Sequence, residues 1–346
     1  MERARPHPAG HRPRVLLVSN MYPGPRTPEW GIFVAEQARS LEAFADVSLV
    51  VRRRRGGAAY PPFLCRTAAA CLRGGCDLIH AHYGFHSALV PSLLSRRPLV
   101  VTFHGSDALI EPRRHRLYRH WQEYVIARAA RVIAVSSEVR ARLIDELGAT
   151  PDRVIHLPCG TDTGRFRPLP RHEARRDLGL AEGSVVLFVG RLSRGKGLEL
   201  LRETAARLPD VDFRLIGDGP LRWEASNCHF LGARPHGEIA TWLNAADLLV
   251  LPSFSEGTPV TVLEALASET PVVCTRVGAC PELIDHGVTG LLIPPGDTDA
   301  LTAAVRKALD AGAFEMSAGR ALITREYDLH VVARRLAEVY AAVCGG

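Results

Sequence analysis

The sequence predicts an α/β protein built from two doubly wound, Rossmann-like domains that face each other across a cleft. Short β-rich apolar runs alternate with longer amphipathic stretches along the chain, a pattern typical of parallel βαβ units. The length of 346 residues fits two domains of about 150 residues better than one. Ligands of such sheets bind beyond the carboxyl ends of the strands, so we expect strand ends to supply the functional residues.

Both halves show this alternation. In the first half we predict helices at 31–44, 65–72 and 112–130, and strands at 15–19, 47–51, 78–82, 99–103, 132–135 and 154–157. In the second half the predicted strands are 185–189, 212–216, 248–251, 271–274 and 290–293. The stretch 168–183, rich in Pro and charge, is predicted as the linker, which places the domains at 1–168 and 169–328. The amphipathic stretch 329–343 opens a C-terminal segment, 329–346, that can pack on either half, including a return to the first.

Composition and cysteines indicate a cytoplasmic protein. No run approaches the roughly 18 apolar residues of a membrane-spanning helix. Residues 1–14 are rich in Arg, His and Pro and lack the apolar core of a signal peptide, so we interpret them as a disordered lead-in. The eight cysteines form no CxxC pair and no zinc spacing, which favours free thiols in a reducing compartment.

The charge is distributed unevenly. Residues 1–168 hold 25 Lys and Arg against 14 Asp and Glu, a net +11, whereas residues 169–346 hold 18 against 23, a net −5. The arginine run 52–55 and the arginines of 112–130 fit a peripheral contact with the inner face of a membrane. Only Lys196 and Lys307 are lysines, so the arginines equally fit a high-GC codon bias and solvated loops. Nucleic acid is not expected as a partner.

A glycine-rich turn follows the strand 185–189. Residues 190–197 match GxxxxGK, the start of a P-loop, but Gly197 stands where a P-loop has the Ser or Thr that holds Mg²⁺. We therefore do not predict an NTPase. A strand–turn–helix that carries Arg191 and Lys196 still suits an anionic phosphate at a helix N-terminus. The alternative is an exposed turn with surface charges.

Two glutamates follow the strand 248–251. Glu256 precedes a helix that we expect to begin at Pro259 with Thr258 as its N-cap, and Glu264 lies inside this helix. The spacing is slightly more than two helical turns, so both carboxylates can reach one ligand. Carboxylates accept hydrogen bonds from sugar or ribose hydroxyls. The alternative is one acid at a helix start and one solvated acid.

Histidines mark two strand ends of the first half. His104 follows the strand 99–103, where capping the next turn is one role open to it. His80 and His82 share a face of the strand 78–82, but a third ligand at fitting spacing is missing, so we predict no metal site. Asp107 is expected to cap the segment that follows it.

Taken together, these motifs resemble the retaining glycosyltransferases of family 4, which have the GT-B fold. The stretch from Glu256 to Glu264 is similar to the EX7E signature of that family. Further similar stretches are 20–23, 31–33, 80–82, 102–107, 132–136, 188–191, 196–197, 217–220, 230–232 and 270–278, with Glu282 and Gly290. The chain departs from the family pattern at Cys159-Gly160, where Asn-Gly is common, and at Gly278-Ala279, where Gly-Gly is common.

The resemblance implies transfer of a hexose-type sugar, with retention and without metal or other cofactor, from a nucleotide-diphosphate sugar to a hydroxyl acceptor. Uridine is the commonest base of the donor in the family. The implied catalytic residues are His104, Glu256, Arg191 and Lys196. The implied donor-binding residues are Gly31, Arg191, Lys196, Glu256, Gly257, Thr258, Pro259, Val260 and Glu264.

Each of these residues has an implied role. Arg191 and Lys196 bind the diphosphate, and Glu264 binds the ribose hydroxyls. Glu256 and the backbone that follows it hold the transferred sugar. Gly31 lets the N-terminal loop approach the phosphate, and His104 contacts the sugar near the reacting carbon.

The acceptor and two rival functions stay open. A lipid-linked saccharide, a polysaccharide precursor and a small natural product are all compatible acceptors. A nucleotide-sugar epimerase on the same fold would convert the donor without an acceptor, and a non-catalytic protein would bind the donor without transfer. A phosphorylase that uses pyridoxal phosphate is disfavoured because Lys196 and Lys307 are the only lysines, in the phosphate turn and in a mixed-pattern helix.

Overall fold

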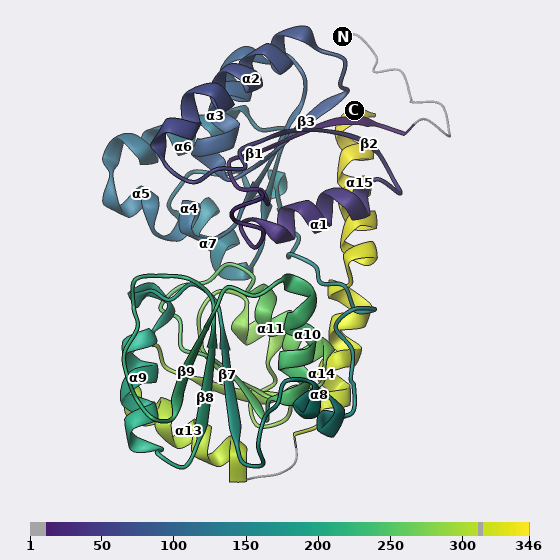
Figure 1. The fold of residues 1–346 in the computed structure, drawn as a ribbon. Coiled ribbons are helices and arrows are strands. Elements are labelled where there is room, and N and C mark those ends of the chain that lie inside the picture. The colour runs from purple at the N-terminus through teal and green to yellow at the C-terminus, as the bar shows by residue number, and fades with distance from the viewer. Residues whose placement is uncertain (1–11, 311–313, 346) are drawn as a thin grey trace. The chain divides into compact units, whose positions relative to one another are not determined.

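The computed structural model describes residues 12–310 and 314–345 and divides the chain into two compact units (Figure 1). The first unit combines Met1–Gly160 with Leu329–Gly346, and the second is Thr161–Asp328. Most of the predicted lead-in, residues 1–11, lies outside the described residues. Each unit contains one six-stranded parallel sheet, which confirms the predicted α/β class.

The six strands predicted for the first unit are confirmed, with small shifts at their ends. Their order in the sheet is β2-β1-β3-β4-β5-β6. The central strands β3 and β4 are buried along their whole length, which explains why they are continuous apolar runs rather than alternating ones. The strands are β1 (Arg14–Ser19), β2 (Asp46–Val51), β3 (Leu78–His82), β4 (Leu99–Phe103), β5 (Arg131–Ala134) and β6 (Val154–His156).

The helices of the first unit differ from the prediction at several places. The helices at 84–94, 106–109 and 137–145 were not predicted, and the helix predicted at 65–72 begins at Tyr60. The single helix predicted at 112–130 is wrong, because His115 adopts extended backbone angles (φ −138°, ψ 115°) and divides it in two. The helices are α1 (Ile32–Leu41), α2 (Tyr60–Arg73), α3 (Gly84–Leu94), α4 (Ser106–Leu109), α5 (Glu111–Arg114), α6 (Arg116–Arg128), α7 (Ser137–Asp145) and α15 (Leu329–Cys344), with 3₁₀ turns η1 (Gly57–Ala59) and η2 (Pro151–Arg153).

The C-terminal helix α15 packs in the first unit. Its buried face, which includes Val332, Leu336 and Tyr340, shares a hydrophobic cluster with Val15 of β1 and Leu78 of β3. The same helix lies beside α1 (Figure 1). Burial of this apolar stripe against the sheet explains the amphipathic pattern of 329–343. The strands that it packs against lie far earlier in the chain.

The second unit has the sheet order β12-β11-β10-β7-β8-β9. Its strands are β7 (Val185–Val189), β8 (Asp212–Ile216), β9 (Cys228–Gly232), β10 (Leu248–Leu251), β11 (Val272–Thr275) and β12 (Gly290–Ile293). Its helices are α8 (Arg171–Asp177), α9 (Leu198–Arg207), α10 (His236–Ala245), α11 (Val260–Ala267), α12 (Cys280–Leu283), α13 (Thr298–Asp310) and α14 (Met316–Leu322), with the 3₁₀ turn η3 (Arg194–Lys196) and the π-helix η4 (Ile323–Tyr327).

The boundary between the units lies after Gly160 rather than after Pro168. Phe166 is fully buried in the hydrophobic core of the second unit. The backbone N–H of Thr161 donates to the carbonyl of Tyr327 (2.8 Å), and the Thr163 hydroxyl donates to Asp328 (2.6 Å). These contacts attach residues 161–168 to the second unit, so the boundary lies before the predicted linker 168–183 rather than at its start.

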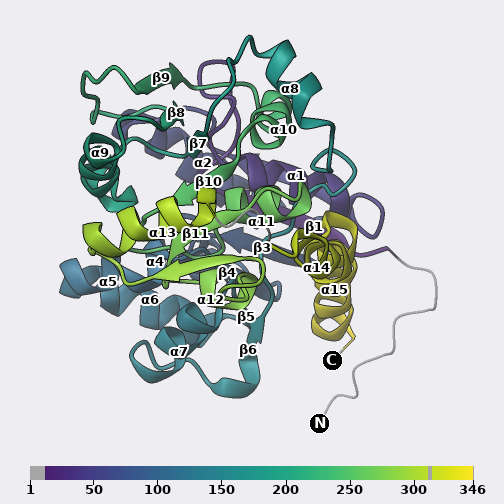
Figure 2. The same cartoon turned by 90° about the horizontal axis from the view of Figure 1, so that it is seen from below.

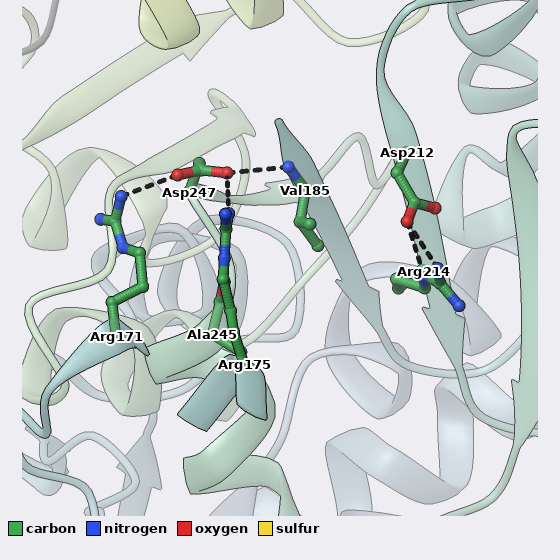
Figure 3. Close-up of polar contacts among 7 residues, drawn as sticks. All are labelled: Arg171, Arg175, Val185, Asp212, Arg214, Ala245 and Asp247. Carbon is green, nitrogen blue, oxygen red and sulfur yellow. Dashed lines mark hydrogen bonds and ion pairs between the residues drawn. The ribbon is translucent and has the colours of Figure 1, made fainter. Parts of the chain in front are cut away.

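Asp247 ties helix α8 to the sheet that carries the candidate site (Figure 3). Its carboxylate accepts hydrogen bonds from Arg171 (2.7 Å), Arg175 (2.6 Å) and the backbone N–H of Val185 at the start of β7 (2.8 Å). Helix α8 also packs beside α10 (Figure 2). The predicted linker region is therefore an ordered part of the second unit.

Among residues 12–310 and 314–345, every helix is too short or too polar to span a lipid bilayer.

Candidate active site

The turn after β7 carries the predicted phosphate-binding residues. Gly197 follows η3 and precedes α9 with a left-handed backbone (φ 71°), and a Cβ atom at this position would lie 1.9 Å from the carbonyl oxygen of Pro252. Only glycine fits both the backbone angle and this close approach. The N–H of Phe254 donates to the carbonyl of Gly195 (3.0 Å), so the turn is joined to the loop that follows β10. The loops that follow β7 and β10, two neighbouring strands of one sheet, are thus joined to each other.

The structure brings Lys196 and Glu256 together. The Lys196 ammonium (Nζ) donates to Oε1 of Glu256 at 2.6 Å, and the two side chains are 30% and 9% exposed. An ion pair at this depth is screened less by water than a surface pair, so it holds both groups in a defined geometry. Arg191 is exposed, and no hydrogen bond or ion pair of its guanidinium is found among the described residues. Of the two predicted phosphate-binding cations, Lys196 is therefore paired and Arg191 faces the solvent.

The helix after Glu256 begins later than predicted. Helix α11 starts at Val260, and Pro259 rather than Thr258 occupies the N-cap position, with extended backbone angles (φ −74°, ψ 97°). Proline has no side-chain acceptor, so this N-cap makes no side-chain hydrogen bond. The carbonyl of Gly257 accepts from the N–H of Ala279 (2.8 Å), which fixes the loop of residues 256–259 against the loop after β11. The positive end of the α11 dipole still points toward this loop.

Glu264 is buried in α11 and faces a histidine that the sequence did not indicate. Oε1 of Glu264 lies 2.6 Å from Nε2 of His236, the first residue of α10, and Glu264 is only 1% exposed. Nδ1 of His236 lies 3.0 Å from Nη1 of Arg165. A guanidinium can only donate, so Nδ1 must accept and Nε2 must carry the proton that Glu264 accepts. Arg165 and His236 therefore orient the Glu264 carboxylate through a neutral imidazole.

His104 lies at the carboxyl end of β4 in the first unit and is partly exposed. Its Nε2 lies 3.0 Å from Nδ1 of His82, the two rings stack with centroids 5.2 Å apart, and Cys159 Sγ lies 3.8 Å from its Nδ1. Burial lowers the pKa of His104 well below its ordinary value, and it lowers that of His82 to about 3. Both imidazoles are therefore uncharged at neutral pH.

The side chain that caps the turn after β4 is that of Asp107, not that of His104. Oδ1 of Asp107 accepts from the backbone N–H groups of His104 (2.9 Å) and Gly105 (3.0 Å), and Oδ2 accepts from that of Gly84 at the start of α3 (3.1 Å). Asp107 was expected to cap the segment that follows it, but the two turn residues that it binds precede it. Burial raises the pKa of Asp107 to about 7.

His80 forms part of the core of the first unit. Its Nδ1 lies 2.6 Å from the Tyr340 hydroxyl, and its Nε2 lies 2.7 Å from that of Thr102. Both ring nitrogens thus have hydroxyl partners. No group of three or more His, Cys, Asp or Glu side chains that could hold a metal occurs among residues 12–310 and 314–345.

Gly31 precedes α1 in a left-handed conformation (φ 72°). A Cβ atom there would lie 2.7 Å from the backbone carbonyl of Met21, so the fold itself requires glycine at this position. The approach of this loop to a phosphate stays a prediction.

The chain matches two family profiles in sequence. Residues 7–165 match the profile described as glycosyltransferase family 4, and residues 183–311 match the one described as glycosyl transferases group 1. A D-inositol 3-phosphate glycosyltransferase of Pseudarthrobacter chlorophenolicus is 36% identical over 283 residues, which are 73% of this chain and 67% of that protein. The putative teichuronic acid biosynthesis glycosyltransferase TuaC of Bacillus subtilis is 30% identical over 348 residues, 85% of this chain and 88% of that protein.

Solved structures share the fold over almost the whole chain. Sucrose-phosphate synthase of Thermosynechococcus elongatus superposes with a TM-score of 0.81 at 22% identity, covering 96% of this chain and 99% of that one. HepE of Anabaena, in complex with UDP-glucose, superposes with a TM-score of 0.79 at 22% identity, covering 96% of this chain and 100% of that one.

Proposed function

Because the chain belongs to the family 4 glycosyltransferases with the GT-B fold, we propose that it transfers a hexose from a UDP-sugar to a hydroxyl acceptor with retention of configuration. One observation carries this proposal. The Lys196–Glu256 pair and the Glu264–His236 pair both lie on loops or helices that follow parallel strands of the second sheet. Cations and carboxylates in this position suit a ligand with a diphosphate at one end and hydroxyls at the other.

In the unliganded protein, the Glu256 carboxylate binds the Lys196 ammonium, which the donor diphosphate binds in its place. When the donor diphosphate arrives, its charge competes for the ammonium and releases Glu256. The released carboxylate then accepts hydrogen bonds from hydroxyls of the transferred sugar. Arg191, which is exposed, supplies a second cation to the diphosphate. This exchange avoids leaving Glu256 or Lys196 as an uncompensated, partly buried charge in the unliganded protein.

Glu264 binds the ribose hydroxyls of the nucleotide. Its position in α11 is fixed by the hydrogen bond from His236, which in turn accepts from Arg165. A carboxylate held in this way recognises two neighbouring hydroxyls with little loss of side-chain entropy. The choice of uridine over guanosine is supported by the solved neighbour HepE, which was crystallised with UDP-glucose.

Transfer requires stabilisation of the departing diphosphate. The bond between the anomeric carbon and the phosphate oxygen breaks, and the acceptor oxygen forms the new bond from the same face. The proton of the acceptor hydroxyl passes to the departing phosphate oxygen. Lys196, Arg191 and the N-terminus of α11 stabilise the negative charge on this oxygen, so we propose that neither a metal nor another cofactor takes part.

His104 contacts the sugar as a neutral group in this proposal. Because burial lowers the pKa of His104 well below its ordinary value, its imidazole is a weak proton acceptor at neutral pH. We therefore assign it to hydrogen bonding with the sugar rather than to general-base catalysis.

We also propose the cytoplasm, including the inner face of a membrane, as the location of the protein, supported by the free cysteines and the basic first half.

A donor panel followed by product analysis tests the proposal. We expect UDP-hexoses to raise the melting temperature more than GDP-hexoses, and a glycosylated product with retained anomeric configuration in the presence of a suitable hydroxyl acceptor. Activity should persist in a chelator. Conversion of the donor in the absence of any acceptor would favour an epimerase, and donor binding without transfer across a broad acceptor panel would favour a non-catalytic protein.

A further inference from the structure

A hollow on the first unit is lined by arginines that the proposed reaction does not use. It has a volume of about 510 Å³, and its lining residues come from α5, α6, the last part of α7 and the residue that follows α7. Arg113 comes from α5, Arg116 and Arg119 from α6, and Arg142 from α7. Four cationic side chains from three helices thus face one space.

Arg142 is the buried member of this group. It is 7% exposed, its guanidinium pairs with Glu146 one helical turn further along, and its Nε has no hydrogen-bond partner among the residues that the structure describes. A buried donor without a partner is costly, so such a group indicates a ligand that completes its hydrogen bonds. Burial and the neighbouring Arg113 and Arg119 lower the pKa of Arg142, as expected for a cation among cations.

The carboxylates of the hollow leave part of its positive charge unbalanced. Glu146 accepts from Arg113 (3.2 Å) in addition to Arg142, and Glu123 accepts from Arg119 (2.9 Å). Arg116 is exposed and makes no ion pair with any described residue. Four arginines therefore face two glutamates, which leaves two positive charges. This excess can balance the charge of about −1.5 to −2 that a phosphate monoester carries at neutral pH.

We propose that this hollow is a binding site for a phosphate group, either of a phosphate ester in solution or of a phospholipid headgroup. Arginines that approach from three helices match the tetrahedral arrangement of phosphate oxygens better than the planar arrangement of a carboxylate. The volume exceeds that of a phosphate ion, so the group is bound as part of a larger molecule. The site shares no residue with the proposed donor site and does not depend on it.

Calorimetric titration of the full chain with glycerol 1-phosphate tests the proposal. Arg116→Glu should weaken binding by at least about tenfold, because it replaces a charged donor with a repelling carboxylate. Arg142→Gln should weaken it comparably. Arg140→Glu makes the same charge change on an exposed position of α7 outside the hollow and should leave the affinity within about twofold. Arg116 is exposed, so its variant remains informative even if Arg142→Gln fails to fold.

A second control separates this site from the donor turn. Lys196→Ala should leave the affinity for glycerol 1-phosphate unchanged. The proposal is overturned if the chain does not bind glycerol 1-phosphate, if Arg116→Glu binds it as well as the unaltered chain, or if Lys196→Ala alone abolishes binding. An equal loss in Arg140→Glu would also overturn it, because that result would show a diffuse charge effect.

Flotation with vesicles identifies the source of the phosphate. Vesicles of phosphatidylglycerol and of phosphatidylcholine are compared for the unaltered chain and Arg116→Glu. Binding to phosphatidylglycerol vesicles that Arg116→Glu abolishes would assign the hollow to a lipid headgroup. Failure to bind vesicles, together with Arg116-dependent binding of glycerol 1-phosphate, would assign it to a phosphate ester in solution.

Discussion

In the second unit, the strand ends carry charges that are already paired, whereas in the first unit they carry uncharged histidines. Lys196 and Glu256 meet at 2.6 Å beyond β7 and β10. His82 and His104 meet at 3.0 Å at the ends of β3 and β4. The two sheets have similar architecture, so the difference lies in the side chains that follow their strands. One edge suits an anionic ligand, and the other suits neutral hydrogen bonding to hydroxyls.

The largest expected effect concerns the charged edge. Lys196→Ala should lower kcat/KM for sugar transfer by about 10²–10³-fold, because the proposed site loses one of the two cations assigned to the departing diphosphate. Arg194→Ala, in the same turn, is the matched control: Arg194 is exposed and pairs with Glu199, so its loss should change kcat/KM little. Steady-state kinetics with a saturating acceptor measure both. A Lys196→Ala enzyme with near-normal kcat/KM would remove Lys196 from the site.

The uncharged edge predicts an acid-sensitive first unit. His82 is fully buried with its pKa lowered to about 3, while an unfolded histidine titrates near 6.5. Below pH 6.5 the unfolded chain takes up a proton that the folded chain excludes, so stability is full above this pH and is lost as the pH falls. His82 should contribute about 1.4 kcal/mol of this loss per pH unit.

Asp107 opposes this loss, because its pKa in the folded chain is raised to about 7. The folded chain therefore binds a proton at Asp107 before the unfolded chain does, and this contribution to stability increases as the pH falls. The difference in the pH dependence of stability between His82→Asn and the unaltered chain therefore isolates the contribution of His82 better than the pH dependence of the unaltered chain alone. Denaturant unfolding at pH 7, 6 and 5 should show a shallower acid slope for His82→Asn than for the unaltered chain. Equal slopes would contradict a neutral, buried His82.

A smaller effect is expected from the histidine behind Glu264. His236→Ala removes the hydrogen bond that orients Glu264 and should raise the Kd for UDP by about tenfold, with kcat at saturating donor reduced less. His229→Ala, on the neighbouring β9 and partly exposed, should leave the Kd for UDP unchanged. Calorimetric titration of UDP distinguishes the two. Unchanged UDP affinity in His236→Ala would show that its contact with Glu264 serves only packing.

The smallest effect concerns the helix that returns to the first unit. Tyr340→Phe removes the hydroxyl that lies 2.6 Å from His80 and keeps the buried ring, so the free energy of unfolding should fall by about 1 kcal/mol. Tyr124→Phe, in α6, is partly exposed and provides a control for loss of a phenol. A stability change for Tyr340→Phe no larger than that of the control would indicate that the hydroxyl contributes nothing to anchoring α15.

The sequence predicted strands well where burial is continuous and poorly where it is not. β3, β4 and β10 are buried throughout and stand out as apolar runs. β9 was missed as a strand, because only Cys228 in it is buried and the strand lies at the edge of its sheet. The break at His115 was missed because neither neighbour is a glycine or proline, and the flanking residues have ordinary helical patterns.

Motifs predicted Lys196, Glu256 and Glu264 as candidate site residues, but they did not predict which side chains pair with one another. Lys196 and Glu256 are 60 positions apart, and His236 and Glu264 are 28 apart. The first pair forms because β7 and β10 are neighbours in the sheet, and the second forms because α10 packs beside α11. Periodicity encodes neither of these arrangements. His236 gave no signal of its own, because a polar residue after a proline is typical of any helix start. The unit boundary was misplaced for a related reason, since the burial of Phe166 depends on the tertiary core.

A structure of the protein with a UDP-sugar tests the central claim most directly. We expect the Lys196 ammonium to have left Glu256 and to lie about 3 Å from a diphosphate oxygen, with Glu264 accepting from the ribose hydroxyls. A bound nucleotide sugar elsewhere, with the Lys196–Glu256 and Glu264–His236 pairs both undisturbed, would contradict the assignment of this edge of the second sheet to the donor.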